Sequence, residues 1–340
     1  MPDTSLILLI LIIALAIGFG VANGFNDAAN AIATVIGTKV LSPRSAIIMA
    51  ACLELLGAAS GIAVAQTIGK GILTQEVITQ FHYIPVIAAL ASIIIWATVA
   101  TYYGMPVSVS HGFVAGLAAA GMALAGAEAV VWGIMGRIMS AVITAPALGF
   151  AGGFALMVAM YWIFHRTAPA RVRVITSYLQ ILSSGFVAYS HGKNDGQMPI
   201  GVITMALVIF YQQPNLWDEL PYGRLWWVVL VSALAISSGV AFGGWRVIRT
   251  LGLRVTALQP VHGFTAQLSA ASVIELASHL GIPVSTTHCI SSSIMGVGST
   301  KRFSAVRWGI AGDIVTAWVL TFPICGGLGY FFAWLLVRIF

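Results

Sequence analysis

The sequence predicts an all-α polytopic membrane protein made of two repeats with inverted topology. Three observations predict this fold class: the composition, the recurrence of two motifs in the same order, and the placement of basic residues between apolar segments. Of the 340 residues, 59% are hydrophobic and only 8% are charged, which is the composition of a membrane protein. Most windows of about 20 residues are apolar enough to cross a bilayer as a helix.

The net charge of +6 is compatible with a nucleic-acid partner, but the basic residues are thinly spread and mostly lie between apolar runs. That pattern is typical of cytoplasmic loops. We therefore expect no nucleic-acid partner and a multi-pass protein of the cell membrane that contacts lipid. The three cysteines lie far apart in apolar segments and predict neither a disulfide framework nor a thiolate metal site. The N-terminal apolar run lacks the features of a cleaved signal peptide, so we expect it to remain as the first helix.

The first recurring motif places an aspartate and two carboxamides within hydrophobic sequence. Residues 24–31 read GFNDAANA, and a reduced copy, HGKNDG, stands at residues 191–196. A charged side chain at bilayer depth costs roughly 2.5–3.5 kcal/mol on insertion scales, so it is normally kept where it faces a cavity, a partner or an ion. Asp27 and Asp195 are therefore predicted to be functional.

The second recurring motif combines a proline with hydroxyl residues and a histidine. It reads PVSVSH at residues 106–111 and PVSTTH at residues 283–288. Proline suits the first turn of a helix, and the hydroxyls that follow can cap the exposed amides or donate to a ligand. The free N–H groups and the positive end of the helix dipole make such a terminus a site for a small anion. Two such termini that point inward from opposite sides would replace much of an oxyanion's hydration shell.

Both motifs occur in the same order in each half, which indicates an internal duplication. If the basic segments between the apolar runs are cytoplasmic, the two copies cross the membrane in opposite directions. We therefore predict a first inverted repeat at residues 1–165, a basic cytoplasmic connector at 166–176 and a second inverted repeat at 177–340, all within one transport domain. Inverted repeats with interrupted helices are typical of secondary transporters.

The two aspartates conflict at first sight with an anion site, because a carboxylate repels phosphate. A carboxylate can hold Na⁺, which neutralises the site, or it can be protonated and donate a hydrogen bond to a phosphate oxygen. Both explanations predict cation-coupled transport. Asn26, Asn30 and Asn194 add neutral carbonyl oxygens, which suit a hard cation such as Na⁺.

Together, the paired motifs resemble those of the PiT family of inorganic phosphate transporters over almost the whole chain. The resemblance implies two inverted repeats with about twelve membrane segments, including helical hairpins, phosphate bound between the two hairpin tips, and Na⁺ or H⁺ as the coupling ion without another cofactor. By position, the implied phosphate-binding residues are Asp27, Ser108, Val109, Ser110, Asp195, Ser285, Thr286 and Thr287. The implied cation-binding residues are Asn26, Asn30, Glu54, Asn194 and Gln267, with Na⁺ assigned to the first four.

Three positions depart from the family pattern. Met198 stands where the second copy commonly has another asparagine, and Gln267 stands where a glutamate is frequent. Val109 stands opposite Thr286, so one hairpin has one hydroxyl fewer. These departures leave open whether a second cation site exists, and a single-cation or proton-coupled variant is an alternative. Sulfate, which some relatives carry, is the alternative substrate. Phosphate is favoured because a protonated phosphate oxygen can donate a hydrogen bond to a carboxylate, whereas fully ionised sulfate cannot.

Two other function classes compete with a secondary transporter. An ion channel would use the same motifs as a filter, but channels usually arrange filters around an oligomer axis, whereas here each half supplies part of one site. A membrane enzyme that acts on phosphoryl groups ranks last, because the sequence has no phosphate-binding loop and no triad pattern. We therefore expect a protein that is not an enzyme. A homodimer is one option for its assembly.

Several polar residues near the motifs have open roles. We expect His111 and His288 to orient the hairpin hydroxyls through hydrogen bonds, and His191 to support a helix break. Lys193 either attracts the anion or pairs with Asp195. The role of Glu275 is open between structure and transport.

Overall fold

The computed structural model describes residues 2–339, and within this range it consists of helices and connecting segments without a β-strand. The α-helices are α1 (Pro2–Gly37), α2 (Pro43–Ala58), α3 (Ala63–Gly71), α4 (Gln75–Phe81), α5 (Ile84–Tyr103), α6 (Val109–Ala125), α7 (Trp132–Phe164), α8 (Pro169–Asp195), α9 (Gln197–Tyr211), α10 (Trp226–Phe242), α11 (Trp245–Arg249), α12 (Pro260–His279), α13 (Thr286–Lys301) and α14 (Trp308–Ile339). The short helical segments are η1 (Ala127–Ala129), η2 (Pro214–Glu219), η3 (Thr250–Arg254) and η4 (Phe303–Ala305).

Within the described residues, four helices are long and apolar enough to cross a membrane: Leu6–Gly37 of α1, and the whole of α5, α7 and α14. Two further pairs, α2 with α3 and α10 with α11–η3, are bent by 64° and 62°, so up to six spans result if each pair counts as one. Large apolar side chains such as Phe154, Trp162 and Phe331 are exposed on α7 and α14. An apolar outer surface on long helices is what a lipid environment requires. The protein is a helical, membrane-embedded protein.

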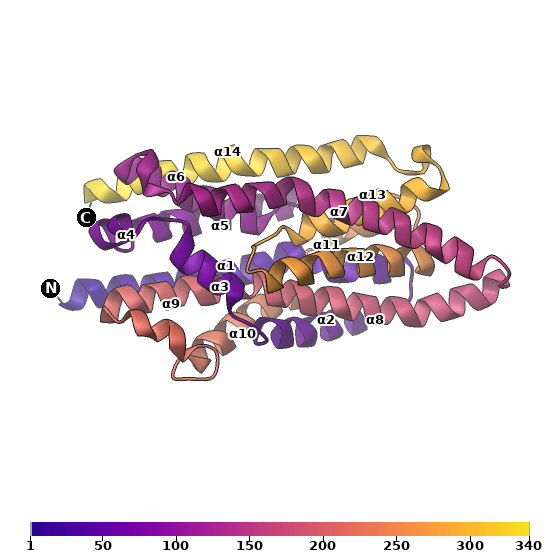
Figure 1. Cartoon of the computed structure of the whole chain (residues 1–340), viewed down its shortest axis with the longest axis horizontal. Helices are drawn as coiled ribbons and strands as arrows, with labels where there is room; N and C mark the ends of the chain where they lie inside the picture. Colours follow the sequence, from indigo (N-terminus) through magenta and orange to yellow (C-terminus); the bar gives the residue numbers. More distant parts are fainter. Residues whose placement is uncertain (1, 340) are drawn as a thin grey trace.

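The long helices lie roughly side by side along the longest axis of the molecule (Figure 1). Both termini lie at one end, whereas the turn from α7 to α8 and the connection from α13 to α14 lie at the other. We call this other end the basic end, because its connecting segments carry Lys39, Arg166 and Arg302. α1 runs toward the basic end, and α8 runs away from it (Figure 1).

The helices that carry the Asn-Asp motifs each pack against a helix from the other half of the chain. α1 packs on α10, and α8 packs on α2. The motif glycines permit this close approach, since a Cβ atom on Gly24 would overlap the carbonyl of Ile236, and one on Gly192 would overlap the carbonyl of Glu54. In the same manner, α6 packs on α14 and α13 packs on α7. The core is thus interleaved from both halves of the chain.

The two motif regions differ in their backbone. α1 continues through residues 24–31, whereas Gly196 separates α8 from α9 directly after Asp195. The basic connector predicted at residues 166–176 is helical in its second part, since α8 begins at Pro169. Proline fits the first helical turn because it needs no amide partner there. α7 continues as one helix across Pro146.

Candidate functional site

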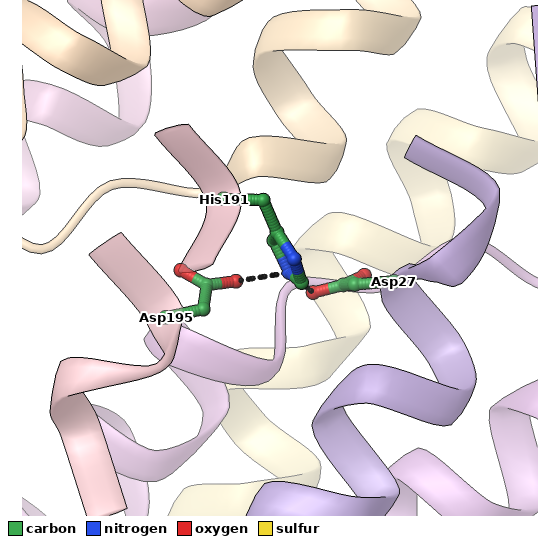
Figure 2. Close-up of side chains that lie close together, drawn as sticks. All are labelled: Asp27, His191 and Asp195. Carbon is green, nitrogen blue, oxygen red and sulfur yellow. Dashed lines mark ion pairs between the residues drawn. The ribbon is translucent and has the colours of Figure 1, made fainter. Parts of the chain in front are cut away.

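Four buried ionisable side chains meet where α1, α2 and α8 pack together. The His191 Nδ1 atom lies 2.8 Å from Glu54 Oε1, and its Nε2 atom lies 3.1 Å from Asp195 Oδ2 and 3.8 Å from Asp27 Oδ2. Figure 2 shows the imidazole ring between the carboxyl groups of Asp27 and Asp195. Each of the four side chains is at most 2% exposed. The imidazole therefore separates three carboxyl groups that would otherwise repel one another.

The local folding explains why these groups meet. His191 and Asp195 are four residues apart on α8, so they occupy one face of that helix. Asp27 reaches the same face from α1, and Glu54 reaches it from α2, next to the contact at Gly192. One ligand atom from each of Asp27, His191 and Asp195 lies within 4.8 Å of the other two. This trio has the spacing needed to hold a cation.

The N-termini of α6 and α13 converge on the same carboxyl groups. Ser110 Oγ donates to Asp195 Oδ1 at 3.2 Å, and Thr286 Oγ1 donates to Asp195 Oδ2 at 3.2 Å. Thr287 Oγ1 donates to Asp27 Oδ1 at 2.7 Å. Both copies of the Pro-Val-Ser motif therefore place hydroxyls at one site, as the sequence predicted from the paired motifs.

α5 with α6, and α12 with α13, form two helical hairpins, and the tip of each, where α6 or α13 begins, is fixed by a serine N-cap. Ser108 Oγ accepts the backbone N–H of His111 at 3.2 Å, and Ser285 Oγ accepts that of His288 at 3.1 Å. The hydrogen bonds expected between these histidines and the hairpin hydroxyls are thus made by the backbone amides of the histidines. The two rings pack against each other with centroids 5.2 Å apart and stack on aromatic residues of α14. Val109 is the first residue of α6, so its backbone N–H lacks a partner within the helix.

The asparagines that precede the two aspartates hold the loops that lead into the hairpin tips. Asn26 Nδ2 donates to Thr101 Oγ1 at 2.7 Å, and Asn194 Nδ2 donates to Ser278 Oγ at 2.9 Å. Each amide also faces the backbone carbonyl directly before the hairpin proline, at 3.5 Å and 3.4 Å respectively. Asn194 Oδ1 accepts the Val284 N–H at 3.2 Å. In these contacts, the amides hold the loops in place.

Asn30 joins the tip of α13 to α1. Its Nδ2 atom donates to Thr286 Oγ1 and to Thr287 Oγ1, at 3.0 Å in both cases. Three buried oxygens of the predicted cation set accept no hydrogen bond from the described residues: Asn26 Oδ1, Asn30 Oδ1 and Glu54 Oε2. Buried polar atoms are normally satisfied, so these oxygens are candidate ligands for an ion.

Gln267 makes a different set of contacts from the other predicted cation residues. Its Nε2 atom donates to the Ala31 carbonyl at 3.0 Å, and its Oε1 atom accepts the Ser183 hydroxyl at 3.0 Å. It joins α12 to α1 and α8, and none of its hydrogen bonds reaches the carboxyl cluster. Both of its polar atoms are engaged.

Reasoning from sequence did not include His191 in the site, although it is the residue that joins the three carboxyl groups. The signal was its spacing of four residues from Asp195 on a helix. Lys193 neither faces the cluster nor pairs with Asp195. It forms an ion pair with Glu275 of α12, whose other oxygen accepts the Ser190 hydroxyl at 3.4 Å.

Comparison with known proteins identifies the family of this chain. A model of the phosphate transporter family matches residues 23–329. The chain belongs to the phosphate transporter family. Members of that family are transporters, which agrees with the expectation that the protein is not an enzyme. The family resemblance that the sequence analysis drew from the paired motifs is therefore confirmed.

This phosphate transporter family member is similar to its relatives over nearly its full length. A protein of Rhizobium meliloti (strain 1021) named "Probable low-affinity inorganic phosphate transporter" is 39% identical over 332 residues, covering 96% of each chain. A protein of the same name from Bacillus subtilis (strain 168) is 38% identical over 338 residues, covering 99% of this chain and 100% of the relative. A solved structure, "The sodium-dependent phosphate transporter", superposes with a TM-score of 0.89 at 26% identity, covering 98% of this chain and 100% of that one.

Proposed function

We propose that this protein imports inorganic phosphate across the cell membrane, together with a cation, by alternating access. The observation that carries the proposal is the arrangement of Asp27 and Asp195, which accept hydrogen bonds from hydroxyls of both hairpin tips. A phosphate ion that enters between the tips can take over the hydroxyl and backbone N–H donors. A protonated phosphate oxygen can in turn donate to one of the carboxylates. The names of the family and of the relatives favour the same substrate.

The carboxylates also favour phosphate over sulfate. Sulfate has no proton to donate at neutral pH, so it cannot donate a hydrogen bond to ionised Asp27 or Asp195, and these carboxylates would repel it. Hydrogenphosphate offers both acceptor oxygens for Ser110, Thr286 and Thr287 and a donor for a carboxylate. Sulfate remains the alternative substrate, and direct transport measurements distinguish it from phosphate.

We infer that Na⁺ is the coupling ion and that its ligands come from the first half of the chain. The unpartnered oxygens of Asn26, Asn30 and Glu54 support this assignment, because Na⁺ prefers uncharged and carboxylate oxygens. In the second half, Met198 offers no oxygen, and both polar atoms of Gln267 are engaged. The solved relative is named as sodium-dependent. Proton coupling through the His191 cluster is the alternative.

We further propose that residues 1–165 and 177–340 are inverted repeats joined by the connector 166–176. α1 and α8 each pack on a helix from the other half of the chain, which supports a repeat. The two hairpin tips that meet at one site support it as well. Placing the basic end in the cytoplasm follows the charge rule for membrane loops. Movement of one repeat against the other would open the site to one side at a time. The total of about twelve membrane segments stays a prediction.

The test is uptake of labelled phosphate, and separately of sulfate, into liposomes that contain the purified protein and an imposed Na⁺ or proton gradient. We expect saturable phosphate uptake that requires the Na⁺ gradient, is abolished in Asp27→Asn and loses Na⁺ dependence in Glu54→Gln. Asp313→Asn is the matched control, since Asp313 is exposed on α14. Uptake of sulfate alone would show that sulfate, and not phosphate, is the substrate. Uptake that does not saturate would favour a channel.

A further inference from the structure

A cavity of about 700 Å³ lies at the basic end, between the ends of α1, α7, α8 and α12. Its lining includes the exposed cationic residues Lys39 and Arg173, the polar residues Thr38 and Thr176, and His165. None of these residues belongs to the carboxyl cluster. The cavity therefore has a positive, water-accessible wall at a distance from the site described above.

Polar side chains on α1 connect the carboxyl cluster to this cavity. Asp27, Asn30, Thr34 and Thr38 follow one another at spacings of three or four residues, so they share one face of the helix. They are all buried. Eleven positions separate Asp27 from Thr38, which corresponds to about 16 Å along an α-helix. Toward the N-terminus of α1, the polar face extends one position further, to the buried Asn23, and residues 6–22 before it are apolar.

α8 presents a matching polar face. Gln180, Ser184 and His191 are buried and lie at helical spacings on the side of α8 that faces α1. The face begins at Thr176 in the cavity wall and ends at Asp195 in the cluster. We call the paired polar faces of α1 and α8 the polar seam.

Besides Asn30 Oδ1 and His191 Nε2, two atoms inside the polar seam lack hydrogen-bond partners among the described residues: Thr34 Oγ1 and Gln180 Nε2. An unsatisfied buried polar group costs about 1–3 kcal/mol, so such groups are retained where water or a ligand reaches them. Both atoms lie between the cavity and the carboxyl cluster. The polar seam therefore has the chemistry of a hydrated passage, closed in this conformation.

Two amide side chains close the polar seam at successive levels. Nearer the cavity, Thr38 Oγ1 donates to Gln180 Oε1 at 2.9 Å, and the Gln180 amide lies against α12 at Gly263, where a Cβ atom would overlap it. Nearer the cluster, Gln267 bridges the Ala31 carbonyl of α1 and Ser183 of α8. These amides are neutral, so the helices can part here without separating an ion pair in a dry environment.

We propose that the cavity is the cytoplasmic vestibule of the transport pathway and that Gln180 and Gln267 form its inner gate. Lys39 and Arg173 hold the tetrahedral oxyanion in the vestibule after it leaves the carboxyl cluster along the polar seam. A side-chain amide offers an acceptor to the coupling cation and a donor to the anion, so the same gate residues serve both ions. The identity of the oxyanion as phosphate rests on the proposed function above.

Thiol labelling from each side of the membrane tests the pathway. In a Cys52→Ser parent, whose remaining cysteines are buried, Thr38→Cys and Thr34→Cys are treated with a membrane-impermeant methanethiosulfonate reagent. We expect Thr38→Cys to react only from the cytoplasmic side. Thr34→Cys should react from that side only while phosphate and Na⁺ are being transported. Adding Gln180→Ala should make Thr34→Cys reactive without substrate. Reaction from the outer side, or no reaction at either position, would overturn the proposal.

A second experiment tests the two cations. Phosphate exchange across oriented liposomes is compared for the wild type, Lys39→Gln with Arg173→Gln, and the control Arg171→Gln, whose side chain is exposed on α8 but does not line the cavity. The double variant should raise the KM for cytoplasmic phosphate by about tenfold and leave the external KM unchanged, since clefts lined by one sign of charge concentrate opposite ions.

Three results of this exchange experiment would contradict the vestibule. These are an equal change on both sides, no change, or a change that disappears when acidic phospholipid is omitted, which would make the cavity a lipid headgroup site. If the wild type carries no phosphate at all, the proposed function fails. The sidedness of labelling at Thr38→Cys, and at Thr34→Cys combined with Gln180→Ala, needs no substrate and then still decides whether the polar seam is a pathway.

Discussion

Asn26 of α1 and Asn194 of α8 make equivalent hydrogen bonds in the two halves of the protein. Each donates its amide to a hydroxyl near the end of the helix before a hairpin tip, Thr101 or Ser278, and faces the carbonyl that precedes the hairpin proline. Hydroxyls of the tips then reach the carboxyl groups. In this way, each motif helix holds the loop of its own half, whereas Ser110 crosses to Asp195 in the other half.

One difference between the two asparagines predicts unequal losses of stability when each side-chain amide is removed. Asn194→Ala leaves the buried Val284 N–H without its 3.2 Å acceptor, whereas Asn26 Oδ1 accepts no hydrogen bond in the described residues. Asn194→Ala should therefore reduce the free energy of unfolding by about 1–3 kcal/mol, and Asn26→Ala should reduce it by less. Thermal unfolding of both variants in the same detergent measures the difference, and equal losses would contradict it.

The close contacts of the motif glycines predict that added methyl groups are harmful there. Gly24→Ala and Gly192→Ala place a Cβ atom against the carbonyls of Ile236 and Glu54, so each should destabilise the fold by about 1–3 kcal/mol. Gly136→Ala on α7 is the control, since nothing lies within 4 Å of its Cβ position. It should be neutral or stabilising by up to about 1 kcal/mol, because alanine is the better helix former. Melting temperatures that fall equally in all three variants would refute the packing argument.

The ion pair between Lys193 and Glu275 predicts non-additive stability effects. The two side chains are 11% and 27% exposed, so removal of one leaves the other charge largely desolvated. Lys193→Met and Glu275→Leu should each destabilise the protein, and the double variant should recover a coupling energy of about 0.5–3 kcal/mol. A double-mutant cycle from chemical or thermal unfolding measures this coupling. Strict additivity would mean that the pair contributes nothing to the fold.

The hydroxyl of Thr287 predicts a selective effect on substrate binding. It donates to Asp27 at 2.7 Å and accepts from Asn30, so Thr287→Val removes one donor from the site while nearly preserving the side-chain volume. The KM for phosphate should rise by about tenfold, equivalent to 1.4 kcal/mol, with the dependence on Na⁺ unchanged. Thr287→Ser retains the hydroxyl and should restore a KM near that of the wild type. A valine variant with unaltered KM would exclude this hydroxyl from phosphate binding.

The sequence predicted those parts of the site that depend on local pattern. Asp27 and Asp195 violate the hydrophobic composition around them, and the hydroxyls of the tips follow a proline in both halves, so each was recognisable within a few residues. The structure brings these groups together. Their roles in binding phosphate and Na⁺ remain predictions.

Other residues depend on how distant helices cross. His191 bridges Glu54 and Asp27 only because α2 and α1 both pack on the same face of α8. Gln267 was assigned to a cation site by its position in the chain, but the face of α12 on which it lies directs its amide to Ala31 and Ser183. For Lys193, helical spacing already argued against a pair with Asp195, since residues two apart do not face each other.

The position of Asp195 bears on how strictly the protein can keep its two cargoes together. Its two oxygens accept one hydroxyl from each hairpin tip, Ser110 and Thr286. If the tips separate without a ligand between them, a buried carboxyl group loses a hydrogen-bond donor, which is unfavourable. A bound oxyanion with its cation supplies new partners for both tips. Slippage, in which the empty or half-loaded carrier turns over and dissipates the ion gradient, is therefore opposed at this single side chain.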